Sequence, residues 1–125
     1  MRYDPERAPD PARWNALSEE ERIEMVERYH RRARIRLPRL RVHAMFHAII
    51  ENQVAMGDEA PVAEAIPRLM KEGLSRHDAV HAVASVMANH LHRALATKEP
   101  VDNDAYFAEV RELTRERWYA EAGPE

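Results

Sequence analysis

Two histidine pairs with the same spacing are the feature of this sequence with the clearest chemical potential. His43 and His47 are four residues apart, and so are His77 and His81. On an α-helix this spacing places two side chains on successive turns of one face. Imidazole nitrogens bind divalent transition metals, zinc above all, with iron, copper and nickel as alternatives. Burying four imidazoles for packing alone costs desolvation energy, so we expect the pairs to hold one metal ion, or two.

A carboxylate extends the first pair by one helical turn. Glu51 follows His47 at the same four-residue spacing, so it is a candidate metal ligand. It is also a candidate catalytic base that takes a proton from metal-bound water. The structural alternative for Glu51 is a salt bridge to Arg41 or Arg76.

A second candidate catalytic base lies between the histidines of the second pair. Residues 77–81 read H-D-A-V-H, which matches the zincin pattern H-E-x-x-H with Asp78 in place of glutamate. Asp78 is also the third residue after Ser75, where a carboxylate caps a helix. We favour the capping role.

The remaining histidines that bear on the site receive separate predictions. His30 falls on the inner face of an expected helix and is either a further ligand or a packing residue, and we favour packing. His90 lies on the opposite side of its helix from His81, so it is expected to be exposed. His92 returns to the face of His81 but lies about 16 Å further along the helix, too far to share an ion.

The elements that must position these residues are all predicted to be helices. The sequence has only three glycines, and its eight prolines lie mostly at element boundaries, so an all-α bundle of four to five helices is expected. Pro67 lies inside the third helix and predicts a kink or two short pieces. The expected helices cover residues 18–36, 39–56, 60–72, 75–95 and 102–118.

An up-down-up order makes the two histidine-bearing helices roughly parallel. In that arrangement His43 is level with His77, and His47 with His81. Glu51 is then level with Ser85.

The chain length of 125 residues fits a single domain. We expect an extended N-terminal arm over residues 1–17, because this stretch is rich in proline and charge. A single helical metal-binding domain is expected over residues 18–119, followed by a frayed tail over residues 120–125.

Composition excludes several classes of function. The chain has no cysteine, so thiolate metal sites, disulfides and cysteine nucleophiles are excluded. A net charge of −3, from 19 basic and 22 acidic residues, argues against nucleic acid as a partner. No apolar stretch suits a membrane span or a signal region, so a cytoplasmic protein without a membrane partner is expected.

Three segments carry a resemblance to a known family. They are His43-Ala44-Met45-Phe46-His47 with Gln53, then His77-Asp78-Ala79-Val80-His81, and then Asp104-Ala105-Tyr106. Over Leu37 to Leu113 the chain resembles the bacterial family called domain of unknown function 1841. The resemblance implies a small helical protein whose paired H-x-x-x-H segments correspond to the four histidines above, and it implies no established activity.

Taken together, the residues predict a small metal-dependent enzyme, hydrolase-like, that activates a bound water through the metal. Glu51 or Asp78 would handle the proton, and the substrate is an unknown small molecule. One alternative is a structural or metal-binding protein whose four ligands close the coordination sphere. Another is an oxygen-handling di-iron or copper protein. A homo-oligomer is left open.

Overall fold

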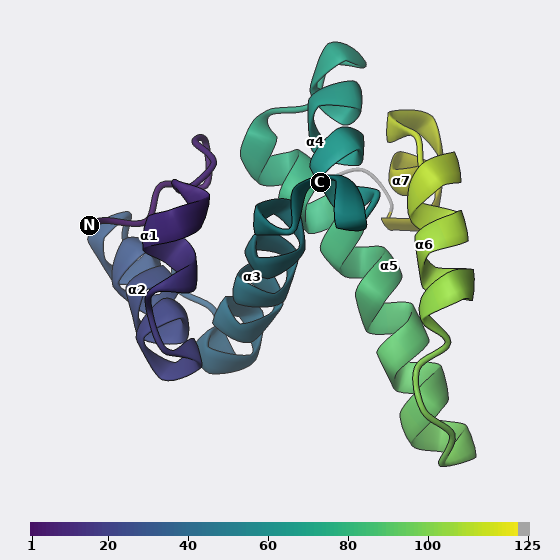
Figure 1. Cartoon of the computed structure of the whole chain (residues 1–125), viewed down its shortest axis with the longest axis horizontal. Helices are drawn as coiled ribbons and strands as arrows, with labels where there is room; N and C mark the ends of the chain where they lie inside the picture. The colour runs from purple at the N-terminus through teal and green to yellow at the C-terminus, as the bar shows by residue number, and fades with distance from the viewer. Residues whose placement is uncertain (123–125) are drawn as a thin grey trace.

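The computed structural model describes residues 1–122, which fold into α-helices joined by short connections, with no strand in that range (Figure 1). The predicted all-α class is confirmed, although the described residues form seven helices instead of four to five. The helices are α1 (Pro11–Asn15), α2 (Glu19–Arg32), α3 (Leu40–Ala55), α4 (Val62–Lys71), α5 (Arg76–Thr97), α6 (Asn103–Glu112) and α7 (Arg115–Ala122), with a 3-10 turn at Gly57–Glu59.

The sequence signals at the start of α2 are confirmed in detail. The Ser18 hydroxyl accepts a hydrogen bond from the backbone N–H of Glu21, and the Glu21 carboxylate accepts one from the N–H of Ser18. This reciprocal capping box satisfies two of the free N–H groups of the first turn. The apolar face of α2 packs on α3, and α3 lies between α2 and α5 (Figure 1).

The two histidine-bearing helices, α3 and α5, run in opposite directions, so the expected parallel arrangement is wrong. Arg76 in the first turn of α5 pairs with Glu51 near the C-terminal end of α3. Figure 1 shows the reason: α4 continues past the C-terminal end of α3 instead of running back along it, so α5 is the helix that returns along α3.

Helix α4 is a single element with Pro67 inside it, so the alternative of two short pieces is wrong. A proline inside a helix removes one backbone hydrogen bond. The buried face of α4, which includes Val62, Ile66 and Leu69, packs into the main core between α3, α5 and α6. This burial offsets the local cost of the proline.

The N-terminal residues are more structured than the extended arm that we expected over residues 1–17. Residues Pro11–Asn15 form α1, and the Asp10 side chain caps this helix by accepting from the N–H of Arg13. Tyr3 and Trp14 are 1% and 0% exposed and belong to a second, smaller core with residues of α2 and α3. Burial of these two large aromatic rings fixes the segment to the bundle.

The expected last helix over residues 102–118 is divided into α6 and α7. The Thr114 hydroxyl accepts a hydrogen bond from the N–H of Arg117 and so begins a new helix. The guanidinium of Arg68 donates to the backbone carbonyls of Val110 and Leu113 at the end of α6. Helix α7 continues to Ala122, within the expected frayed tail, and the remainder of that tail lies outside the described residues.

A search of the described helices for a membrane span finds none that is both long and apolar enough.

Candidate metal centre

Five histidines from three helices converge between α2, α3 and α5. The Nε2 atom of His47 lies 3.1 Å from Nε2 of His43 and 3.0 Å from Nε2 of His81. One ring nitrogen from each of four histidines lies within 4.8 Å of the other three, and these four are His30, His43, His47 and His77. The structure therefore brings together all four histidines of the predicted pairs and adds His30. We call these five residues the histidine cluster.

The antiparallel helices reverse the predicted pairing within the cluster. The ring of His43 lies 5.0 Å from that of His81, and the ring of His47 lies 5.2 Å from that of His77, measured between centroids. The expected levels, His43 with His77 and His47 with His81, assumed parallel helices. The cluster forms nonetheless, because a four-residue spacing on both helices places two imidazoles opposite two others in either direction.

His30 is part of the cluster, although packing was the favoured interpretation from sequence. Its side chain is fully buried, and its Nδ1 lies 2.8 Å from the carbonyl oxygen of Val26. A carbonyl only accepts hydrogen bonds, so Nδ1 carries the proton and Nε2 carries a lone pair. That Nε2 is buried without a hydrogen-bond partner, as is Nε2 of His77.

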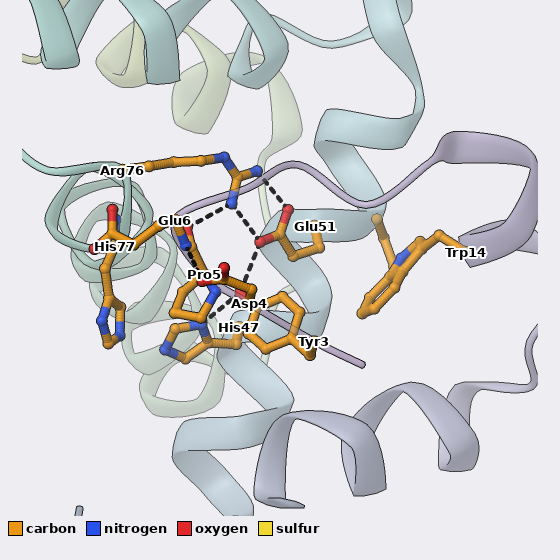
Figure 2. Close-up of polar contacts among 10 residues, drawn as sticks. Tyr3, Asp4, Pro5, Glu6, Trp14, His47, Glu51, Arg76 and His77 are labelled. Carbon is orange, nitrogen blue, oxygen red and sulfur yellow. Dashed lines mark hydrogen bonds and ion pairs between the residues drawn. The ribbon is translucent and has the colours of Figure 1, made fainter. Parts of the chain in front are cut away.

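The orientation of His47 is set by Tyr3, a residue that belongs to none of the sequence motifs. The Tyr3 hydroxyl donates to Oε2 of Glu51 at 2.6 Å and lies 3.0 Å from Nδ1 of His47 (Figure 2). Because the single hydroxyl proton goes to the carboxylate, Nδ1 of His47 is the donor in the second contact. The Nε2 atom of His47 therefore carries a lone pair that faces the other imidazoles.

Glu51 forms the salt bridge that was its alternative role. Its two oxygens accept from Nη1 and Nη2 of Arg76 at 2.8 and 2.7 Å, and its side chain is 0% exposed. With the Tyr3 hydroxyl as a third donor, the carboxylate is directed away from the histidine nitrogens (Figure 2). The group of side chains close enough to share an ion contains histidines alone among the described residues. The structure thus does not bring Glu51 into the cluster as a ligand.

Asp78 occupies the capping position that we favoured. It lies in the first turn of α5, where its backbone N–H donates to the Ser75 hydroxyl at 3.1 Å. Its carboxylate is not among the groups that converge with the histidines. Its negative charge acts on His77 from a distance and partly counters the lowering of the pKa of that imidazole.

The N-terminal segment closes one side of the cluster. The backbone oxygen of Tyr3 accepts from Arg32 at 3.2 Å, and that of Pro5 accepts from Arg76 at 2.9 Å. The carboxylate of Glu6 accepts from the N–H of His77 at 3.3 Å (Figure 2). Residues 3–6 are thereby held against α2 and α5.

Burial favours the uncharged form of His43, His47, His77 and His81. Desolvation, together with neighbouring imidazoles, lowers the pKa of His43 to about 4 and that of His81 to about 3. The same causes lower the pKa of His47 further, and desolvation followed by His30 lowers that of His77. Neutral imidazole is the form that binds metal ions, because its lone pair is free.

A surface cavity of about 290 Å³ between α3, α5 and α7 reaches the cluster. His43, His47 and His81 line it together with the apolar rings of Phe46 and Trp118. The cavity gives water and small molecules access to the histidine nitrogens.

The two other histidines of α5 lie outside the cluster. His90 was expected to be exposed, but it is 4% exposed and its Nε2 lies 3.0 Å from a carboxylate oxygen of Glu109. Its burial follows from packing against Tyr106 of α6, which covers this face of α5. His92 is exposed.

Comparison with protein families gives one match. The model of a family described as "Domain of unknown function (DUF1841)" matches residues 13–112. The chain belongs to this DUF1841 family. All five cluster histidines lie within the matched residues, whereas Tyr3 and Trp118 lie outside them. Searches of curated proteins and of solved structures found no match to this DUF1841 chain.

Proposed function

We propose that the histidine cluster binds a divalent transition metal ion, zinc in the first place, with iron, copper and nickel as alternatives. The observation that carries this proposal is that hydrogen bonds fix which ring nitrogen carries the proton in two imidazoles. His30 donates through Nδ1 to Val26, and His47 donates through Nδ1 to Tyr3. Histidine ligands of metals characteristically donate their second ring N–H to a neighbouring oxygen in this way.

The spacing of the nitrogens also supports the proposal. Tetrahedral zinc with ligands at about 2.0–2.1 Å requires neighbouring nitrogens to be about 3.3 Å apart. One ring nitrogen each from His30, His43, His47 and His77 lies within 4.8 Å of the other three. The buried Nε2 atoms of His30 and His77 have no hydrogen-bond partner, which is costly for polar atoms inside a protein. A cation at the centre of the group would give both nitrogens a partner, with His77 in the tautomer whose lone pair is on Nε2.

We further propose that the bound metal activates water for hydrolysis of a small molecule. His30, His47 and His77 are the ligands in this proposal, which leaves a coordination position on the side of the cavity. Neutral imidazole ligands leave the charge of the ion uncompensated, and this charge lowers the pKa of a bound water toward neutrality. His43 and His81 line the cavity beside this position, so one of them is the proposed proton acceptor. They take this role because the carboxylate of Glu51 is engaged by Arg76 and Tyr3.

A closed structural site is the second candidate. It is favoured because four ring nitrogens, one of them from His43, all lie within 4.8 Å of one another. In that case His43 is a fourth ligand, no water is bound and the ion only stabilises the bundle. The di-iron alternative is not carried forward, because such sites draw on several carboxylates and the described group has none.

Metal content and stability of purified protein test the proposal. Wild-type protein is expected to retain one equivalent of zinc after loading and dialysis, and His47→Ala is expected to lose it. His43→Ala and His81→Ala retain zinc if the site is open, whereas His43→Ala loses it if the site is closed. Wild-type protein that retains none of the four metals would overturn both candidates.

A further inference from the structure

The cavity beside the histidine cluster has a size and a lining that select among substrates. Its volume is about 290 Å³, at the lower end of the range for ligand pockets. A cavity of about 150 Å³ suffices for benzene, so this one admits a ring with a short polar group. Phe46 of α3, Trp118 of α7 and two alanines of α5 form its apolar walls.

The lack of charged side chains in the cavity lining narrows the substrate classes further. The residues that line the cavity include no lysine, arginine, aspartate or glutamate. The nearest buried ion pair, Glu51 with Arg76, is neutral as a whole and faces the other side of His47. A bound metal would therefore be the single charged centre in an apolar cavity. It would polarise one oxygen of a ligand, and no cationic side chain would be present to hold further anionic oxygens.

Resting on the hydrolytic function proposed above, we infer that the substrate class is a small carboxylic ester or amide with an apolar body. The carbonyl oxygen would approach the metal, and the apolar body would lie against Phe46 and Trp118. Water adds to the carbonyl carbon, the bond from that carbon to the alcohol oxygen or amine nitrogen breaks, and the products are a carboxylic acid and an alcohol or amine. The proton that the water loses ends on the leaving alcohol oxygen or amine nitrogen, so the step balances.

Phosphate esters are excluded by the same reasoning. A phosphate group brings two negative charges and several acceptor oxygens, and recognition of such groups relies on arginine or lysine. Of the basic residues between positions 31 and 36, Arg31, Arg34 and Arg36 line a different cavity, and Arg32 donates to the backbone oxygen of Tyr3. They are therefore not available to the histidine cluster.

The test compares ligands and substrates on zinc-loaded protein whose metal content is measured first. Isothermal titration with benzamide and with phenyl phosphate gives binding, and hydrolysis of p-nitrophenyl butyrate and p-nitrophenyl phosphate gives activity. We expect benzamide to bind and phenyl phosphate to bind at least about tenfold more weakly than benzamide. We also expect p-nitrophenyl butyrate to be cleaved and p-nitrophenyl phosphate not to be cleaved. Preference for the phosphate compounds, or zinc-loaded protein that binds and cleaves none of the four, would overturn the inference.

Cavity-filling variants tie the result to this cavity. Ala88→Leu and the exposed Ser85→Leu both project into it from α5, and Ala96→Leu at an exposed position of the same helix is the matched control. The first two are expected to raise KM for the butyrate ester at least about tenfold with zinc content unchanged, and the control to leave it unaltered. Unchanged KM in both cavity variants would show that the substrate lies elsewhere. Failure of the wild type to retain zinc would instead count against the metal site itself.

Discussion

Tyr3 and His47 are 44 residues apart in the chain, yet the Tyr3 hydroxyl lies 3.0 Å from Nδ1 of His47 and donates its proton to Glu51. Burial and the nearby charge of Glu51 raise the pKa of Tyr3 well above its usual value, so the phenol keeps that proton. The imidazole of His47 is thus held in one tautomer by a residue outside the cluster. In our proposal Glu51 is not a ligand of the metal, and it is connected to the ligand His47 by hydrogen bonds through Tyr3.

The Tyr3→Phe variant tests this chain of contacts. Removal of the hydroxyl frees Nδ1 of His47, and loss of such an outer hydrogen bond weakens metal binding by about 10- to 100-fold. A competition titration of zinc against a chelating dye measures the change. Tyr29→Phe is the matched control, because Tyr29 packs edge-on against Tyr3 while its hydroxyl forms no hydrogen bond within the described residues. Equal zinc affinity in the two variants would contradict the role of Tyr3.

The buried pair of Glu51 and Arg76 is expected to matter for stability more than an exposed pair does. Glu51→Gln leaves the guanidinium of Arg76 buried without its counter-ion, and the free energy of unfolding should fall by about 3–5 kcal/mol. Glu64→Gln, in the exposed i,i+4 pair with Arg68, should cost less than about 1 kcal/mol. Urea denaturation of metal-free protein measures both.

The same Glu51→Gln variant separates a ligand from a positioning residue. Folded variant protein should still retain one equivalent of zinc, with weaker affinity, because the carboxylate does not contact the ion in our proposal. A folded variant with no zinc would return Glu51 to the ligand role predicted from sequence.

His30 and His90 provide a comparison between two buried histidines with different surroundings. His30→Ala removes a proposed ligand, so zinc affinity should fall by more than about 100-fold, beyond the range for outer-shell losses. His90→Ala breaks the contact with Glu109 and should lower the free energy of unfolding by about 1–3 kcal/mol, with zinc affinity unchanged. The dye competition and urea experiments decide the matter. Zinc affinity that is insensitive to His30 would remove it from the site.

The metal-free protein is expected to lose stability in acid over a defined window. The pKa values of His43 and His81 in the folded protein are about 4 and about 3, below the ordinary value of 6.5. As pH falls below 6.5, these histidines bind protons in the unfolded chain but not in the folded protein. The free energy of unfolding therefore decreases until the pH reaches the pKa values of the folded protein. Above 6.5 both states are neutral and this contribution is fully present.

Urea denaturation at several pH values, from about 7.5 to about 4.5, measures this loss of stability over most of the pH range in which it occurs. A double variant, His43→Gln with His81→Gln, should show a shallower dependence on pH. His92→Gln is the control, because its side chain is exposed. A double variant with the wild-type slope would mean that other groups cause the acid sensitivity.

Local signals in the sequence predicted the helices and the two pairs well. The capping box at Ser18 and Glu21 and the four-residue spacing from His43 to His47 depend only on neighbours along the chain. The direction of α5 relative to α3 depends on the direction that α4 takes after α3, and Pro67 suggested a division of α4 into two pieces that does not occur. A pattern with the same spacing on both helices identifies the members of a cluster but leaves their pairing undetermined.

The residues that sequence reasoning missed all act across long distances in the chain. His30 stands alone on its helix face and has no partner at helical spacing, so nothing local separates it from a packing residue. Tyr3 lies in a segment rich in proline, and Trp118 lies on a helix that begins only because Thr114 interrupts the preceding one. Their contribution depends on tertiary contacts that no periodic pattern records.

The contacts of residues 3–6 also bear on the order in which the site assembles. The hydrogen bonds of Tyr3, Pro5 and Glu6 with α3 and α5 join residues that are 44 to 71 positions apart. Closing loops of this length costs conformational entropy before the new contacts repay it, whereas helices form from near neighbours. The tautomer of His47 is therefore fixed only once the N-terminal segment has docked on the bundle.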